Sequence, residues 1–256
     1  MTFIIAEAGI NHHGHVNTAA ELCYQAKKSG ADAVKFQLFD SVKLWGDDRI
    51  KHLGLTHNDT RYLCQICTDI GIEFLCTPFG VEELEFLTPL VKRIKIASGR
   101  RKPGLIEAAY KTGLPVIVST GMADLNELEW IVDSKPEDTD LTLLHCTSCY
   151  PCELEDVNLR AMMAIQNRYS CCHIGYSDHT ADILAPVVAV ALGACVIEKH
   201  FTLDRNAEGP DHKTSLEPAL FRQMVEDIRD TEILMGRGEK KVLSCEEKLR
   251  SEWYAE

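Results

Sequence analysis

Residues 173–202, HIGYSDHTADILAPVVAVALGACVIEKHFT, decide the fold of this chain. An apolar strand pattern ends near Ser177, a helical pattern follows, and a second apolar strand pattern covers residues 194–198. In a parallel sheet the carboxyl ends of all strands lie on one side. His179 and His200, which follow the two strands, are therefore expected to enter the same space although they are far apart in the sequence.

The same strand and helix unit recurs along the chain. Strands are expected over residues 3–7, 32–36, 73–76, 93–97, 115–118, 141–145, 173–177 and 194–198. Helices are expected over residues 17–29 and 58–70, from Val81, from Gly104, from Leu125, over 156–167, within the opening stretch, and over 218–234. Apolar strands separated by helices form a parallel sheet covered on its faces, and eight such units predict an α/β (β/α)8 TIM barrel.

A doubly wound sheet is the alternative fold. It would place a glycine-rich turn after the first strand, and AEAGINHHGH contains no G-x-G-x-x-G. The barrel is expected to occupy residues 1–240 as one catalytic domain, with residues 241–256 as a tail or the start of a linker.

The composition limits the classes of partner. The chain has 256 residues, 45% of them hydrophobic and 26% charged, and a net charge of -12, which argues against a nucleic-acid surface. No stretch approaches the ~20 apolar residues that cross a bilayer. The start, MTFIIAEAGI, lacks a basic region and is predicted to be the first strand rather than a signal peptide. We expect a cytoplasmic protein that binds small molecules and no membrane.

Eleven cysteines without a secretory signal are expected to be reduced thiols. Cys64 and Cys67 share one face of a helical pattern, which favours packing over a metal site. Cys146, Cys149 and Cys152 follow a strand and could hold an iron–sulfur cluster, but a fourth ligand is not evident. The alternative for both groups is that they are small hydrophobic side chains.

Lys35 and Lys95 each lie inside an otherwise apolar strand. A buried ammonium is costly unless it is paired or meets an anion. One interpretation is a structural ion pair with Glu7 or Glu198. The other is that the lysines hold a phosphate or carboxylate, helped by hydroxyl donors from nearby strand ends: Thr77, Ser98, Ser119 and Ser177.

The two histidines and a basic triplet complete the candidate site. His179 and His200 at adjacent strand ends suit a divalent metal, which with two protein ligands keeps positions open for a substrate oxygen. Arg100, Arg101 and Lys102 follow the fourth strand. They either attract an anion to the site or belong to a solvated loop.

A series of motifs resembles the sialic acid (N-acetylneuraminate) synthase family. In order they are IAEAGINHHG, GADAVKFQ, LCTPF, IKIASG, PVIVSTGM, LLHCTSCYP, IGYSDHT, IEKHFTLDR and GPDHKTSLEP. The resemblance implies a barrel with manganese or magnesium on His179 and His200. It implies phosphoenolpyruvate bound by Lys35, Thr77, Lys95, Ser98, Ser119 and Ser177. It also implies that Glu7, Gln37, Tyr150 and Asp211 face the aldose and the reacting carbons.

Three departures from the family pattern concern the sugar. The family continues into a small antifreeze-like domain, whereas this sequence ends in SCEEKLRSEWYAE. Arg100 is the first of a basic triplet where the family has an acidic residue in contact with the sugar. Ser148 stands where the family has an asparagine. We therefore expect an aldose other than plain N-acetylmannosamine, either a sugar similar to it or a different one such as a phosphorylated or carboxylated aldose. The resemblance implies a homodimer.

The expected reaction is the metal-dependent condensation of phosphoenolpyruvate with an aldose, giving a nonulosonic or related 3-deoxy-2-keto sugar acid and phosphate. Glu7 would place the water that attacks C2 or move its proton. Two alternatives stay open. One is a sugar-phosphate aldolase or isomerase, with Lys95 or Lys199 as a Schiff-base nucleophile in an aldolase. The other is a non-catalytic regulatory barrel.

Overall fold

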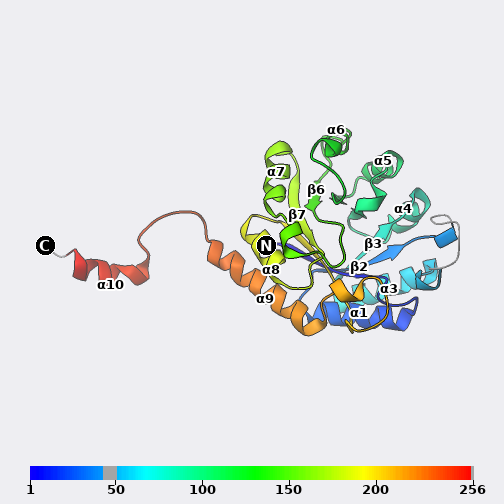
Figure 1. The fold of residues 1–256 in the computed structure, drawn as a ribbon, viewed down its shortest axis with the longest axis horizontal. Helices are drawn as coiled ribbons and strands as arrows, with labels where there is room; N and C mark the ends of the chain where they lie inside the picture. Colours follow the sequence, from blue (N-terminus) through cyan, green and yellow to red (C-terminus); the bar gives the residue numbers. More distant parts are fainter. Residues whose placement is uncertain (43–50, 255–256) are drawn as a thin grey trace.

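Eight parallel strands form the centre of the fold in the computed structural model, which describes residues 1–42 and 51–254 (Figure 1). They are β1 Phe3–Gly9, β2 Ala33–Leu38, β3 Glu73–Pro78, β4 Ile94–Ile96, β5 Val116–Ser119, β6 Leu141–His145, β7 His173–Asp178 and β8 Val196–His200. The hydrogen-bonded order is β3-β2-β1-β8-β7-β6-β5-β4, and β3 contacts β4 to bring the two ends together. This confirms the predicted TIM barrel.

The helices that follow the strands match the expected order, and one further helix, Ser244–Trp253, lies in the segment that was expected to be a tail or linker. They are α1 Val16–Lys28, α3 His57–Ile70, α4 Val81–Leu87, α5 Pro103–Lys111, α6 Glu129–Asp133, α7 Arg160–Arg168, α8 Leu184–Ala191, α9 Pro218–Met235 and α10 Ser244–Trp253. Two of them begin later than predicted. The helix expected from Leu125 starts at Glu129, after a 3-10 turn. The helix expected from residue 156 starts at Arg160, because Asn158 has a φ of 44°, which an α-helix does not allow.

An apolar layer fills the interior of the barrel below the strand ends. Its members are Ile5, Ala33, Leu75, Ile117, Leu144 and Val196. Side chains two residues apart on a strand point to the same face. The next inward-facing position on five of these strands is polar: Glu7, Lys35, Thr77, Ser119 and Glu198. The apolar layer therefore forms a floor, and the polar residues lie directly above it.

Gly175 lets β7 approach its neighbours closely. A Cβ at this position would lie 2.5 Å from the Val196 carbonyl oxygen and 2.6 Å from Cδ2 of Leu144. Only glycine avoids this overlap. Ser177 follows two residues later on the same strand and so enters the polar layer.

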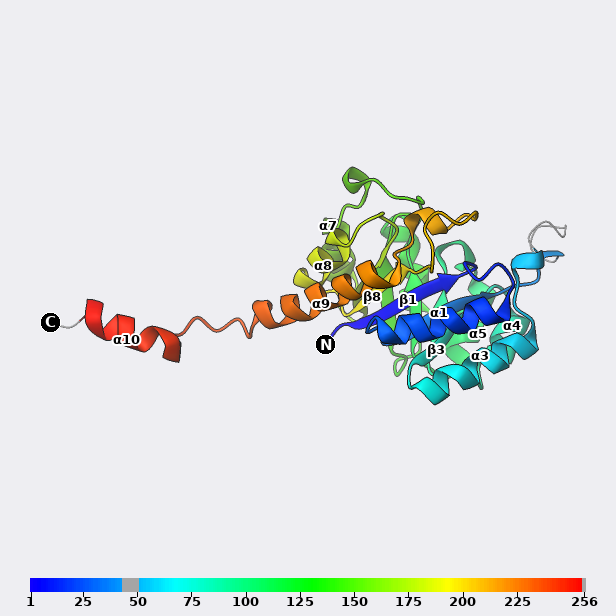
Figure 2. The ribbon, with the colours of Figure 1, turned by 90° about the horizontal axis from the view of Figure 1, so that it is seen from below.

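The helices cover the outside of the barrel. α3 begins with a capping box between Thr56 and Asp59 and ends at Gly71, whose φ of 71° is left-handed. α9 packs against α8 and α1, which Figure 2 shows beside it. α10 buries no residue and extends away from the barrel (Figures 1 and 2). Within residues 1–42 and 51–254, no helix combines the length and apolar character needed to cross a membrane.

Candidate active site

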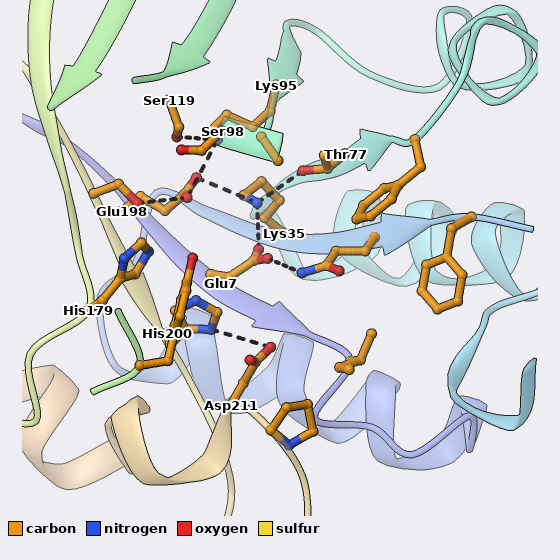
Figure 3. Close-up of a pocket in the computed structure, with 18 of the residues that line it drawn as sticks. Glu7, Lys35, Thr77, Lys95, Ser98, Ser119, His179, Glu198, His200 and Asp211 are labelled. Carbon is orange, nitrogen blue, oxygen red and sulfur yellow. Dashed lines mark hydrogen bonds and ion pairs between the residues drawn. The ribbon is translucent and has the colours of Figure 1, made fainter. Parts of the chain in front are cut away.

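A cavity of about 390 Å³ opens at the carboxyl ends of the strands (Figure 3). Most of the site residues expected from the sequence line it: Glu7, Lys35, Gln37, Thr77, Lys95, Ser98, Ser119, Tyr150, Ser177, His179, His200 and Asp211. Arg100 and Ser148 do not line this cavity. The polar layer above the barrel floor is thus one wall of a single space.

Lys35 lies at the centre of the polar layer. Its Nζ lies 2.7 Å from Oε2 of Glu7 and 3.5 Å from Oε2 of Glu198. It also donates to Oγ1 of Thr77 at 3.0 Å. Glu7 Oε1 accepts a hydrogen bond from Nε2 of Gln37 at 2.9 Å. Glu7 of β1 and Gln37 of β2, which were both expected to face the substrate, are therefore hydrogen-bonded to each other.

Lys95 approaches the same carboxylate from the other side. Its Nζ lies 3.6 Å from Oε1 of Glu198 and donates to Oγ of Ser119 at 2.7 Å. Ser177 also donates to Glu198 Oε1, at 3.1 Å. Two ammonium groups and two carboxylates are thus nearly excluded from water, with Lys35 2%, Lys95 1%, Glu7 3% and Glu198 6% exposed. The ion pairs considered from the sequence exist, and they form one connected network.

The network fixes the charges of its members. Burial alone would raise the pKa of Glu198, but the ammonium groups of Lys35 and Lys95 lower it to about 2. Burial acts to lower the pKa of Lys35, and the carboxylates of Glu198 and Glu7 outweigh it and raise that pKa. Burial lowers the pKa of Lys95, against the opposing charge of Glu198. Glu198 is therefore an anion at neutral pH and balances the lysines.

Sequence reasoning considered Glu198 only as an ion-pair partner and left it out of the site. The structure places it between both lysines, on the cavity wall. The signal was present in the strand, because Glu198 is two residues before His200 and so shares its inward face. The aromatic wall residues Phe39 and Phe79 were also missed.

His179 and His200 lie beside each other, with ring centroids 5.5 Å apart. Nδ1 of His179 lies 2.6 Å from the Thr147 carbonyl oxygen, to which it donates as an N–H. Burial and the neighbouring His200 lower the pKa of His179 to about 4, so the ring is neutral at pH 7. Its Nε2 then presents a lone pair, which is the form in which histidine binds a metal.

His200 also has a ring nitrogen that is free to bind a metal. Its buried Nδ1 has no hydrogen-bond partner and lies 3.8 Å from Oδ2 of Asp211. The Tyr150 ring packs against both imidazoles, with centroids 4.2 Å from His179 and 5.6 Å from His200. Among the described residues, no group of three or more histidine, cysteine or acidic side chains is placed to hold a metal. The donors fit an open site with two protein ligands.

Arg100 and Arg101, the first two residues of the basic triplet, lie in different surroundings. Arg101 Nη1 donates to the carbonyl oxygens of Ser119 at 3.1 Å and Gly121 at 2.6 Å, so this guanidinium braces the end of β5. Arg100 lies in an adjoining cavity of about 450 Å³, with its guanidinium 5.0 Å above the Phe79 ring. Phe79 lines both cavities. Arg100 is thus separated from the main cavity by one aromatic side chain.

Ser148 lines a third cavity, of about 510 Å³, behind β5 and β6. Its buried Oγ has no hydrogen-bond partner. A Cβ at Gly121 would lie 2.3 Å from this oxygen and 2.9 Å from Oγ of Ser98, so the Ser148 hydroxyl lies close to Ser98, which lines the main cavity. The structure therefore places Ser148 beside one expected site residue, but not among the residues that line the main cavity.

The cysteines and Lys199 make contacts outside the cavity. Sγ of Cys146 lies 3.3 Å from Oγ of Ser98, Cys149 is exposed, and Cys152 donates to the Glu153 carbonyl. Lys199 points away from the cavity and is bound to Asp178. It is therefore not placed to act as the Schiff-base nucleophile that was considered from the sequence.

Comparison with known proteins agrees with the fold and the motifs. The model of the NeuB family matches residues 22–240. The chain is 44% identical to the N,N'-diacetyllegionaminic acid synthase of Legionella pneumophila, over 93% of this chain and 74% of that protein. It is 35% identical to the human N-acetylneuraminate-9-phosphate synthase, over 95% of this chain and 74% of that protein.

A solved structure of a sialic acid synthetase has the same fold. The N-acetylneuraminic acid synthetase of Leptospira borgpetersenii, crystallised with citrate, superimposes with a TM-score of 0.92 at 35% identity, covering 98% of this chain and 90% of that one. The family model covers most of the sequence, and the fold extends over nearly all of it. The chain belongs to the NeuB family.

Proposed function

We propose that this protein condenses phosphoenolpyruvate with an aldose to form a nonulosonic or related 3-deoxy-2-keto sugar acid and phosphate. Family membership makes the chain an enzyme of the sialic acid synthase type that acts on small molecules. The observation that carries the specific reaction is one cavity lined by two buried lysines and two histidines. The catalytic unit is the barrel, assigned to residues 1–240.

The lysines and hydroxyls would bind phosphoenolpyruvate. Its phosphate and carboxylate are anions, and Lys35 and Lys95 offer buried ammonium groups beside Thr77 and Ser119. Ser98 and Ser177 line the same wall and add neutral donors. Charge-assisted hydrogen bonds in a site with little water are stronger than neutral ones. Glu7 and Glu198 keep the lysines in place before the anion arrives.

The histidines would hold a divalent cation, manganese or magnesium. Nε2 of His179 and a ring nitrogen of His200 are the donors available for it. Such an ion polarises a carbonyl oxygen as a Lewis acid. Tyr150 packs on both rings, and Gln37 and Asp211 also line the cavity, so these three side chains would orient the aldose.

The reaction would proceed at the junction of these two halves. C3 of the enol attacks the aldehyde carbon, and the positive charge that develops at C2 is trapped by water. Glu7 would hold this water and accept its proton, since its carboxylate lies on the cavity wall between the lysine and histidine groups (Figure 3). The tetrahedral adduct then loses phosphate by cleavage of the C–O bond.

The position of Arg100 favours an aldose that has an anionic group. It lies behind Phe79, at the edge of the main cavity, where the far end of a sugar with a phosphate or carboxylate could reach it. Ser148 lies beside Ser98 and does not itself line the main cavity, so its contact with the aldose stays a prediction. A homodimer and a cytoplasmic location stay predictions.

The test is phosphate release from phosphoenolpyruvate with manganese and a panel of acylamino aldoses, neutral and phosphorylated. We expect release that requires one of the aldoses and is abolished by a chelator. Variants His179→Ala and His200→Ala should abolish it too. Release from no aldose, or release that is indifferent to the chelator, would contradict the proposal.

A further inference from the structure

An ion pair between Asp178 and Lys199 lies behind the wall of the cavity and takes no part in the proposed reaction. Both side chains are completely buried, and neither lines the cavity. The two residues are register partners on the parallel strands β7 and β8. Each stands directly before one of the two histidines, Asp178 before His179 and Lys199 before His200.

The pair is bonded to the chain on both sides of His179. Lys199 Nζ donates to Oδ2 of Asp178 and, at 2.5 Å, to the carbonyl oxygen of Thr180. Asp178 Oδ1 accepts from Tyr176 Oη at 2.8 Å and from the Thr180 backbone N–H at 3.2 Å. One ammonium thus joins the residues that flank His179 to the residue that precedes His200.

The two histidines depend on this link to different degrees. His179 has fixed neighbours of its own: its carbonyl oxygen accepts from the Cys152 backbone N–H at 2.8 Å and from Oγ1 of Thr214 at 2.5 Å, and its ring is bound to Thr147. Nδ1 of His200 has no hydrogen bond. The His200 carbonyl oxygen accepts the Leu216 backbone N–H at 2.9 Å. Among the described residues no hydrogen bond fixes the direction of the ring, which packs against Tyr150 and His179, so the backbone link at Lys199 contributes to its position.

Stability alone explains such a pair poorly. Removing two charges from water is costly, and well-packed hydrophobic residues of the same volume often give an equally stable protein. We infer that Asp178 and Lys199 form a positioning pair, which sets the separation and direction of His179 and His200. The inference rests on the proposed function, because it requires a divalent cation on these two histidines. Loss of residues that orient metal ligands typically weakens metal affinity about 10- to 100-fold.

The test measures manganese binding by isothermal titration calorimetry, without substrate, in the full chain. The double variant Asp178→Asn with Lys199→Met removes both charges together and keeps similar volumes. We expect its thermal midpoint to stay close to that of the wild type, while its manganese Kd rises at least about 10-fold. Tyr176→Phe removes one donor to Asp178 and provides a milder variant, with a smaller expected increase in the manganese Kd than the double variant.

A second, more exposed ion pair far from the cavity provides the control. Glu73 and Arg93 form a two-point contact of 2.7 and 3.1 Å at the start of β3, at the opposite end of the strands from the cavity. The double variant Glu73→Gln with Arg93→Met should leave the manganese Kd unchanged. An equal rise in Kd for both double variants would assign the effect to general loosening and overturn the positioning role.

The remaining outcomes separate this inference from the proposed function. If His179→Ala abolishes manganese binding while the Asp178 and Lys199 double variant binds as the wild type does, the positioning role is wrong and the metal site stands. If the wild type binds no manganese, or if His179→Ala leaves binding intact, the proposed metal site and the positioning role are both wrong.

Discussion

Lys35 Nζ lies 2.7 Å from Oε2 of Glu7, and both side chains are 3% exposed. The two residues are register partners on β1 and β2. The lysine is therefore held in a charged state by groups of the protein itself, before any substrate binds. An arriving anion meets a cation that is already desolvated and oriented, which is the kind of preorganisation on which electrostatic catalysis depends.

Replacing Lys35 with methionine should lower the free energy of unfolding. It leaves three charged groups, Glu7, Glu198 and Lys95, with an uncompensated negative charge, and breaking a buried pair in this way costs about 3–5 kcal/mol. We expect the free energy of unfolding, measured by urea denaturation, to fall by that amount.

The double variant Glu7→Gln with Lys35→Met restores neutrality and is the control for Lys35→Met. Most of the lost stability should return, while phosphate release stays abolished because the anion site lacks its lysine. Recovery of activity together with stability would show that the pair is structural only.

Arg100→Ala should discriminate between substrates. If the guanidinium binds a phosphate or carboxylate of the sugar, its loss removes a charge-assisted hydrogen bond, worth about 1.5–3 kcal/mol or a KM increase of about 10- to 100-fold. The KM for an anionic aldose should rise by that factor, and the KM for phosphoenolpyruvate should not change. Lys111→Ala, which removes an exposed cation at the end of α5, is the control. Small and equal effects on both substrates would contradict the role of Arg100.

Gly175→Ala tests the packing of the barrel wall. The added Cβ would overlap the Val196 carbonyl oxygen at 2.5 Å, and forcing extra atoms into a packed core costs about 1–3 kcal/mol. We expect that loss in the free energy of unfolding. Gly104→Ala places the same methyl group in α5 with no atom within 4 Å, and should leave stability unchanged or slightly higher. Equal effects of the two substitutions would contradict the close approach at Gly175.

His12 should make the protein sensitive to mild acid. Burial, then the adjacent His13, lowers the pKa of His12 from 6.5 to about 4, and Nδ1 accepts the Gly14 backbone N–H at 3.0 Å. The unfolded chain then binds the proton more readily than the folded one between these values. The free energy of unfolding should therefore fall as the pH drops from 6.5 towards 4, by up to about 3 kcal/mol.

The measurement is urea denaturation at pH 7.5 and at pH 4.5. His12→Gln should reduce the pH-dependent loss, whereas His15→Gln, which alters an exposed imidazole, should keep it. An identical pH dependence in the wild type and His12→Gln would contradict the assignment to His12.

The barrel could be predicted from the sequence because its signal is local and repeated. Near-continuous apolar runs such as VIVS of β5 are typical of strands covered on both faces, and they alternate with helical patterns along the chain. The helix starts were less certain. The left-handed backbone of Asn158 delays α7, and no pattern in the residues around it indicated that conformation.

The site was predicted incompletely. Which polar side chains meet in the cavity depends on which face of each strand they occupy and on the loops that follow the strands. The period of two places Glu198 and His200 inward and Lys199 outward, but a glutamate in an apolar strand also fits a purely structural ion pair, so the place of Glu198 on the cavity wall was not predicted. No pattern in the residues around Arg101 indicated that its guanidinium donates to carbonyl oxygens at the end of β5. Such contacts depend on the conformations of the loops that follow the strands. A pattern of apolar residues does not predict loop conformations.

The most direct test of the central claim follows the oxygen atoms of the reaction. Phosphoenolpyruvate, manganese and the best aldose of the panel are incubated with the protein in ¹⁸O-labelled water, and the phosphate and sugar acid are analysed by mass spectrometry. C–O cleavage predicts one sugar acid for each phosphate, and phosphate without ¹⁸O. Phosphate that contains ¹⁸O, released without a sugar acid, would show simple hydrolysis at phosphorus and contradict the proposed function.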